Sequence, residues 1–222
     1  MFSSDFVGRL GLNLPGSWLE LRHAVRVVEV VDLIAAGEFA RSREWRKALE
    51  QVHEAVTLTD WPHGSRRFTI YPGRHQNGVL PIKKPCIQRL KKLGWLTERI
   101  PRLPGEVLTP GDLDGLFETS QGCIGFEWET GNISSSHRAI NKLLLTLHNR
   151  GILGGILVVP SQKLYQFLTD RVGNIGELRP YFPLWQATPI GNGCLQIVVA
   201  EHDAASKKVR KIPKGTDGRA RR

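Results

Sequence analysis

The sequence predicts an α/β fold, in which helices flank both faces of a central mixed β-sheet. Short apolar runs of strand length, at 155–160 and 195–200, alternate with longer stretches whose apolar residues recur at helical spacing. From residue 111 the expected order is hairpin, helix, strand, helix and strand, which is typical of a sheet covered on both sides. A chain of 222 residues, 41% of them hydrophobic, can bury one sizeable core. We therefore expect a single domain over residues 1–202.

The N-terminal 60 residues are expected to form a helical outer layer. Apolar residues recur at helical spacing over 17–39 and again over 41–56. The first apolar stripe comprises Trp18, Leu21, Val25, Val28 and Leu33, and the second comprises Trp45, Leu49 and Val52. We expect a short strand at 68–71, a basic amphipathic helix at 83–93 and a proline-punctuated loop at 101–110 to follow.

The next region combines a hairpin with the clearest helix of the chain. Residues 119–122 carry a turn signal between two strand-like segments. Over 133–149 the apolar residues share one helical face, and serines stand at the helix start. A strand at 155–160, a helix at 162–170 and a strand at 195–200 complete the expected sheet and its cover.

Four carboxylates occur on this hairpin in two pairs of equal spacing. Glu127 and Glu129 are two residues apart, as are Asp112 and Asp114, so the members of each pair point to the same face of a strand. A single pair of this kind is more often a solvated face. Two pairs that meet across one hairpin favour a shared cation, and oxygen ligands suit Mg²⁺. Phosphodiester hydrolysis is the chemistry that such a site favours.

The positive charge of the chain is concentrated at its C-terminal end. The net charge is 31 − 21 = +10, and residues 203–222 contribute 8 − 2 = +6 of it. Such a field attracts phosphate polyanions without implying any sequence preference. We expect residues 203–222 to be an arm that is disordered until it meets DNA, although a solubilising tail is the alternative.

Cysteine spacing and hydropathy favour a cytoplasmic protein. Cys86, Cys123 and Cys194 form no C-x-x-C pair, so we expect them to be reduced, without zinc or disulfides. The N-terminus has no secretory pattern, and the apolar run at 151–160 is too short to cross a membrane.

Four collinear blocks resemble the BamHI family of type II restriction endonucleases. The first reads W-E-T-G-N-I-S-S at 128–135, followed by His137-Arg138 and N-K-L-L-L at 141–145. The others lie within 61–83, 168–182 and 212–218, and together the blocks cover roughly half of the chain. The resemblance implies the restriction-endonuclease fold with a PD-(D/E)XK core in its E-x-E variant. It also implies that residues 61–202 hold the catalytic and recognition core.

The resemblance implies a role for each acidic residue. Glu127 should bind the metal, and Glu129 should position or deprotonate the attacking water. An aspartate of the hairpin should complete the metal site. Asp114 has the apolar flanks of the family's strand, whereas Asp112 follows Pro110 at the P-x-D spacing, so we favour Asp114 and keep Asp112 as the alternative. Glu98 matches a further acidic residue near the family's metal site.

DNA-contacting residues are implied in the same way. Side chains at a helix start can reach base edges while the backbone meets phosphate, and an Asp-Arg pair can read cytosine and guanine. The implied contacts are Asn132, Ser134, Arg138, Asp170, Arg171, Lys83, and Asp217 with Gly218 in the arm. Lys84 could serve in place of Lys83. The matching residues of the family read GGATCC, so we expect the same target.

The implied enzyme is a Mg²⁺-dependent endonuclease that cuts double-stranded DNA to 5′-phosphate and 3′-hydroxyl ends. Mn²⁺ should substitute, and Ca²⁺ should support binding without cleavage. A palindromic target implies a homodimer, with 133–149 and 162–170 as the expected interface. A companion DNA methyltransferase follows from the enzyme class. The alternatives are a DNA-binding protein without catalysis and a nuclease that reads only GATC.

Overall fold

The computed structural model describes residues 24–103, 110–169 and 171–214, and a five-stranded mixed sheet forms its centre. The strand order is β1-β6-β5-β4-β3. The strands are β1 (Arg26–Ala36), β3 (Gly115–Glu118), β4 (Cys123–Trp128), β5 (Gly154–Pro160) and β6 (Gly193–Glu201). The three central strands are parallel, and each edge strand is antiparallel to its neighbour. The expected mixed sheet is confirmed.

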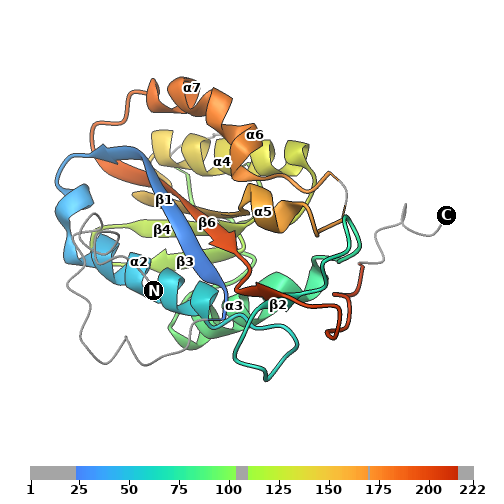
Figure 1. Ribbon diagram of the computed structural model, residues 1–222. Coiled ribbons are helices and arrows are strands. Elements are labelled where there is room, and N and C mark those ends of the chain that lie inside the picture. Colours follow the sequence, from blue (N-terminus) through green and yellow to red (C-terminus); the bar gives the residue numbers. More distant parts are fainter. Residues whose placement is uncertain (1–23, 104–109, 170, 215–222) are drawn as a thin grey trace.

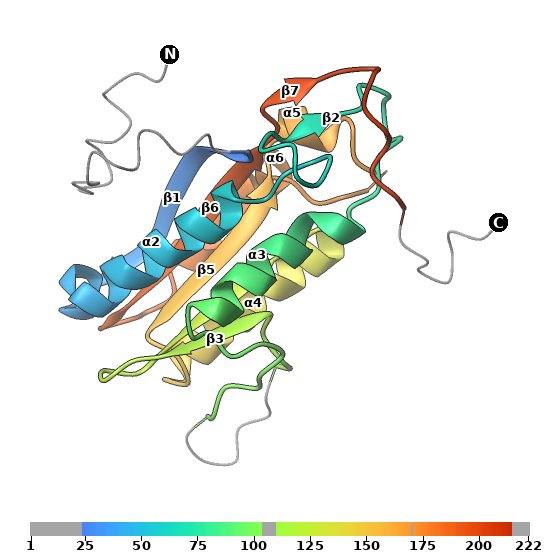
Figure 2. The ribbon, with the colours of Figure 1, turned by 90° about the horizontal axis from the view of Figure 1, so that it is seen from below.

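Helices cover both faces of this sheet. In Figure 1, α4, α6 and α7 lie above the sheet, and α2 and α3 lie below it. Figure 2, from below, shows α2 and α3 across the near face. The helices are α2 (Arg43–Thr57), α3 (Leu80–Lys92), α4 (Ile133–His148), α5 (Gln162–Tyr165), α6 (Ile175–Leu178) and α7 (Phe182–Gln186), with 3-10 turns η2 (Phe39–Arg41) and η3 (Arg179–Tyr181). Within the described residues, no helix is both long enough and apolar enough to cross a membrane.

Strand β5 shows how the two layers are joined. Its side chains alternate, so Ile156 and Val158 enter the core under α2 and α3, whereas Leu157 and Val159 enter the core under α4. All four are fully buried, which explains why this strand is apolar throughout and not alternately polar. Each such side chain contributes about 1.5–3 kcal/mol by leaving water.

The prediction of a helix over 17–39 is wrong for residues 26–36, which form the edge strand β1. The run is rich in valine, which favours strands. Two register shifts, between Val27 and Glu29 and between Asp32 and Ile34, interrupt the pairing of β1 with β6. Each shift offsets the alternation of faces, so the apolar residues recur at three- and four-residue intervals that imitate a helix. Residues 1–23 of that prediction lie outside the described residues.

The helix expected at 162–170 ends at Tyr165. Beyond it the chain pairs with residues 75–77, since His75 N donates to Gln166 O and Asn77 N donates to Phe167 O. In a longer helix these carbonyls would accept from backbone N–H groups further along the same helix. Here they accept from residues 75–77 instead, so the helix does not continue.

The arm expected at 203–222 is not detached over its first twelve residues. Strand β7 (Ala204–Ala205) pairs in parallel with β2 (Thr69–Ile70), and Ile212 is buried. The expectation of disorder is therefore wrong for 203–214, because apolar and backbone contacts anchor a segment whose charge alone resembles a free tail. Residues 215–222 lie outside the described residues.

Asn77 joins the anchored segment to the rest of the protein. It is fully buried, and its Nδ2 donates to Tyr71 O at 2.8 Å and to Phe167 O at 2.9 Å. Its Oδ1 accepts from Ile212 N at 3.2 Å. One side chain thus connects three segments that are far apart in sequence.

We expect Asn77→Ala to lower the free energy of unfolding by about 3 kcal/mol, at roughly 1 kcal/mol for each of three hydrogen bonds. Urea unfolding followed by circular dichroism measures the change. The control is Gln76→Ala, because Gln76 is the exposed neighbour and should change stability by less than about 0.5 kcal/mol. Equal effects of the two changes would contradict the role assigned to Asn77.

Candidate active site

The hairpin of β3 and β4 brings two acidic residues together at one end of the sheet. Gly115 pairs with Phe126, so Asp114 lies opposite Glu127 immediately beyond that pair. Asp114 Oδ2 accepts a hydrogen bond from Trp128 N at 3.0 Å. Glu127 is 6% exposed and points away from the core that its neighbours Phe126 and Trp128 fill.

Glu129 follows β4 and stands in the turn to α4. Its backbone N still donates to Val158 O at 3.0 Å, so the residue remains bound to the sheet. Its Oε1 accepts from Gly131 N, and this bond fixes the carboxylate beside the helix start. A side chain at Gly131 would meet Glu129 Oε1 at 2.7 Å, so glycine allows this close approach.

Two lysines from opposite helical layers pair with the carboxylates. Lys83 of α3 donates to Asp114 at 2.9 Å (Oδ1) and 3.1 Å (Oδ2). Lys142 of α4 forms an ion pair with Glu127 and also donates to the backbone carbonyl of Asp112. The site therefore combines two carboxylates with two ammonium groups.

Burial and charge shift the acidity of these groups. Burial lowers the pKa of Lys83, but the charge of Asp114, its hydrogen bond and the charges of Glu127 and Glu129 outweigh burial, so the pKa is raised. Burial raises the pKa of Glu127 to about 7, against the charge and hydrogen bond of Lys142. The negative charge of Asp114 adds to the rise, and Lys83 opposes it.

The carboxylate oxygens fit a hard divalent cation. Within residues 24–103, 110–169 and 171–214, no three acidic, histidine or cysteine side chains converge closely enough to hold an ion by themselves. Mg²⁺ commonly takes only one or two protein carboxylates and completes its shell with water and phosphate oxygens. Asp114 and Glu127 supply two carboxylates of this kind, one from each arm of the hairpin.

The start of α4 adjoins this acidic site and presents polar side chains to solvent. Asn132 caps the helix, since its Oδ1 accepts from Ser135 N at 3.0 Å. Ser134 and Arg138 are exposed and lie one helical turn apart, on the same face. Arg171 is also exposed, and its carbonyl accepts from Ile133 N at 3.1 Å, which places it against the helix start.

Comparison with known proteins identifies the family of the chain. The family model of restriction endonuclease BamHI matches residues 25–219. The chain belongs to the BamHI family.

Two relatives of the BamHI family are named type II restriction enzymes. OkrAI of Oceanobacter kriegii is 46% identical over 172 residues, which cover 78% of this chain and 88% of the relative. BamHI of Bacillus amyloliquefaciens is 36% identical over 184 residues, which cover 80% and 84%. Among solved structures, restriction endonuclease BGLII complexed with a DNA 16-mer has a TM-score of 0.54 at 10% identity, covering 84% of this chain and 86% of that one. This last likeness concerns the fold alone.

The acidic residues expected for the BamHI family differ in placement. Asp114, Glu127 and Glu129 belong to one electrostatic cluster, because the negative charge of each raises the pKa of Lys83. The Asp112 side chain is exposed, and only its backbone carbonyl contacts the site through Lys142. Glu98 lies on a segment that bridges to β3. Its side chain is exposed, and within the described residues it forms no ion pair with the lysines of the acidic site.

The expected DNA-contacting residues are only partly described. Asn132, Ser134, Arg138 and Arg171 lie together around the start of α4. Lys83 points to Asp114 and Lys84 is exposed, so the two lysines are not equivalent. Asp170, Asp217 and Gly218 lie outside the described residues.

Lys142 is a site residue that the sequence reasoning missed. It lies within the N-K-L block that carries the resemblance to the BamHI family, but no role was assigned to it. A signal was available, because Lys142 is one turn from the buried Ala139 and Thr146. An ammonium group beside buried positions is costly unless a carboxylate pairs with it.

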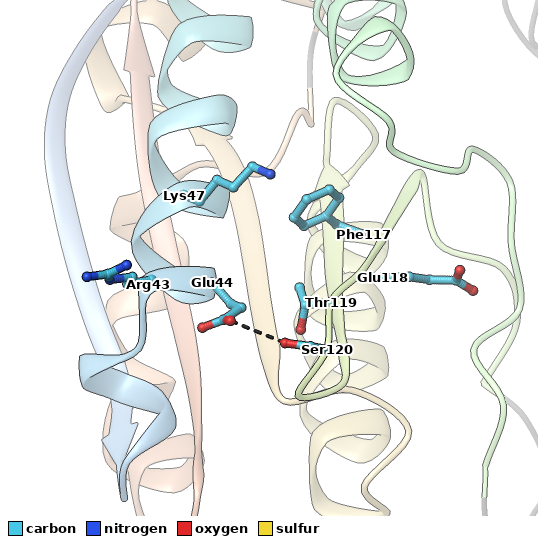
Figure 3. A pocket seen from close by; sticks show the side chains of 7 residues that line it. All are labelled: Arg43, Glu44, Lys47, Phe117, Glu118, Thr119 and Ser120. Carbon is cyan, nitrogen blue, oxygen red and sulfur yellow. Dashed lines mark hydrogen bonds between the residues drawn. The ribbon is translucent and has the colours of Figure 1, made fainter.

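A separate pocket of about 260 Å³ lies between α2 and the turn of the β3–β4 hairpin (Figure 3). Arg43, Glu44 and Lys47 line one side, and Phe117 to Ser120 line the other. The carboxylates of the acidic site do not line it, so this pocket is not where the chemistry of the family is expected.

Proposed function

We propose that this type II restriction endonuclease of the BamHI family is Mg²⁺-dependent and cuts double-stranded DNA at GGATCC, leaving 5′-phosphate and 3′-hydroxyl ends. The observation that carries the proposal is the junction of β4 and α4. Asp114, Glu127 and Glu129 stand on one side of this turn, and Asn132, Ser134 and Arg138 stand on the other. Chemistry and readout thus share one rigid element. The relatives BamHI and OkrAI support the enzyme class.

In the proposed hydrolysis, different acidic residues would bind the metal and activate the water. Asp114 and Glu127 would hold Mg²⁺, with Mn²⁺ able to substitute and Ca²⁺ supporting binding without cleavage. When bound, the metal supplies Lewis-acid charge at the scissile phosphate. Glu129 would orient the attacking water and accept its proton, since the bond from Gly131 N holds this carboxylate at the turn. Glu98 would act only at the margin of the site, and Asp112 stays the alternative to Asp114.

Readout of the bases would come from the helix start and its neighbours. Asn132, Ser134 and Arg138 would contact base edges or phosphates, and Asp170 with Arg171 would read a C·G pair. Lys83 keeps 40% of its side chain exposed and would face the DNA backbone. Asp217 and Gly218 would enter the minor groove.

A palindromic target requires a two-fold protein, so we propose a homodimer. The layer of α4, η3 and α7 carries three exposed apolar side chains: Leu145 at 44%, Tyr181 at 47% and Leu184 at 68% exposure. The exposure of Leu184 favours α7 as the partner of α4 in this interface, in place of the expected 162–170 helix, which ends at Tyr165. A companion methyltransferase would protect host DNA.

Digestion of a mapped plasmid with Mg²⁺ tests the proposal. Fragments that end only at GGATCC are expected. Cuts at every GATC would replace the proposal by a relaxed nuclease of the same fold. Retention of duplex binding without any cutting would replace it by a DNA-binding protein.

Metal binding should depend on pH through Glu127. The pKa of Glu127 is raised to about 7, so protons compete with a cation below that pH, and the competition ends above it. The apparent affinity for Ca²⁺ should therefore fall by up to about tenfold per pH unit below pH 7 and level off above about pH 8. Calorimetric titration in two buffers of different ionisation enthalpy measures the accompanying proton release. Glu127→Gln should eliminate this release, and an affinity that is unchanged between pH 6 and 8 would contradict the assignment.

A further inference from the structure

Eight exposed cations gather on two segments that are distant in sequence. We call them the basic surface, and they comprise Arg66, Arg67, Arg74, Lys207, Lys208, Arg210, Lys211 and Lys214. Within the described residues, none of the eight forms an ion pair. Two carboxylates lie close by in the chain. Asp60 accepts from Gly64 N and Arg66 N and so binds the loop backbone, and Asp203, whose N donates to Phe68 O, is exposed. With eight cations against these two acids, the basic surface carries an excess of positive charge.

The two segments are firmly joined, so the basic surface is a built feature of the fold. Strands β2 and β7 pair, and Trp61 Nε1 donates to Arg210 O at 2.9 Å. The Arg210 guanidinium lies 4.8 Å from the centre of the Trp61 ring, and Lys211 Nζ lies 5.0 Å from that of Tyr71. Gly78 N donates to Ile212 O at 2.7 Å, and a side chain at Gly78 would collide with Pro213 O. This packing fixes the cations relative to the protein.

A continuous set of backbone contacts links the basic surface to the start of α4. Ile212 contacts Asn77 and Gly78, and Asn77 pairs with the segment 167–169. That segment leads to Val172, which bridges to Asn132. Neighbouring segments of this kind lie about 5 Å apart, so the basic surface is only a few segments from the helix start. Figure 1 shows β2 and the C-terminal part of the described chain at the same end of the molecule as α5.

We infer that the basic surface binds the phosphate backbone of duplex DNA independently of sequence. This rests on the proposed function, because duplex DNA is the polyanion that the neighbouring helix start would engage. Neighbouring cations that form no ion pair repel one another, and phosphates relieve that repulsion while displacing condensed counterions. The segment 66–74, which carries Arg66, Arg67 and Arg74, thus extends the DNA-binding surface beyond the arm. The basic surface thereby contributes a salt-dependent part of the affinity for duplex DNA and contacts no bases.

The test uses the full-length Arg66→Gln/Arg67→Gln/Arg74→Gln variant. The dissociation constant is measured in Ca²⁺ over about 50 to 300 mM salt, on duplexes of about 30 base pairs with and without GGATCC. The slope of log affinity against log salt should become shallower by up to about 2.7, at about 0.9 for each lost phosphate contact. The change should be equal on both duplexes, and thermal unfolding should show an unaltered fold.

A matched control removes three exposed cations elsewhere: Arg43→Gln/Arg46→Gln/Lys92→Gln. It lowers the net charge equally and should change the slope by less than about 1. Equal slopes for both variants, no change in either, or an effect confined to the GGATCC duplex would each overturn the inference. If the wild-type protein does not prefer GGATCC, the proposed specificity fails, while the slope on the second duplex still decides the role of the basic surface.

Discussion

Glu127→Ala is expected to lower the rate of DNA cleavage by about a hundredfold to a thousandfold while duplex binding persists, because one preorganised electrostatic group commonly contributes that much to a rate. Glu127 is 6% exposed and lies between Asp114 of the hairpin and Lys142 of α4. As a proposed metal ligand, it contributes charge that no neighbouring side chain can replace. The residues at the helix start are untouched by the change, so binding should remain.

Single-turnover cleavage of a GGATCC duplex in Mg²⁺ measures the loss, and gel-shift binding in Ca²⁺ measures what is retained. Removal of Glu127 leaves the Lys142 ammonium without its counterion, so a second variant, Glu127→Gln, keeps a hydrogen-bond acceptor there. Glu118→Ala provides the control, since Glu118 is an exposed acid on the same hairpin. Cleavage within tenfold of wild type in the Glu127 variants would show that the site is misassigned.

Comparing the cleavage rates of Asp114→Asn and Asp112→Asn should show which of the two aspartates is the metal ligand. Asp114→Asn is expected to reduce cleavage by roughly a hundredfold to a thousandfold, because it removes a charge directly opposite Glu127. Asp112→Asn should change the rate by less than about threefold, since only the backbone carbonyl of Asp112 meets the site, and that carbonyl is retained. Both changes are isosteric, so packing is not altered.

The same single-turnover assay compares the two variants at saturating Mg²⁺ and again at limiting Mg²⁺. A ligand loss should be partly recovered by excess metal, whereas a folding defect should not. A larger defect in Asp112→Asn than in Asp114→Asn would transfer the ligand role to Asp112.

Elements with local signals were predictable from the sequence. Helix α4 has an apolar stripe at regular spacing and a capping asparagine, so its limits were expected within one residue. Strand β5 is a short, uninterrupted apolar run, which is typical of a buried parallel strand. Strand β1 was not predictable, because its two register shifts erase the alternation on which strand prediction depends.

The acidic site likewise has features that the sequence predicts and contacts that it does not. The spacing of Glu127 and Glu129, and the hairpin that brings Asp114 to them, are local features. The pairing of Lys142 with Glu127 and the contacts of Asn77 join residues that are far apart in sequence. Such contacts depend on how the layers pack, and a single sequence carries no pattern for them.

Both borders of the sheet are protected against the addition of another strand. At β1 the register shifts distort the outer border, and Glu29 holds Arg179 in an ion pair beside it. At β3 the border is only four residues long, and the chain around Leu96 and Arg99 already bridges to it. Free strand borders invite a second copy to pair and extend the sheet into an aggregate. With both borders blunted, the proposed homodimer would form through the helical layers, where association can stop at two copies.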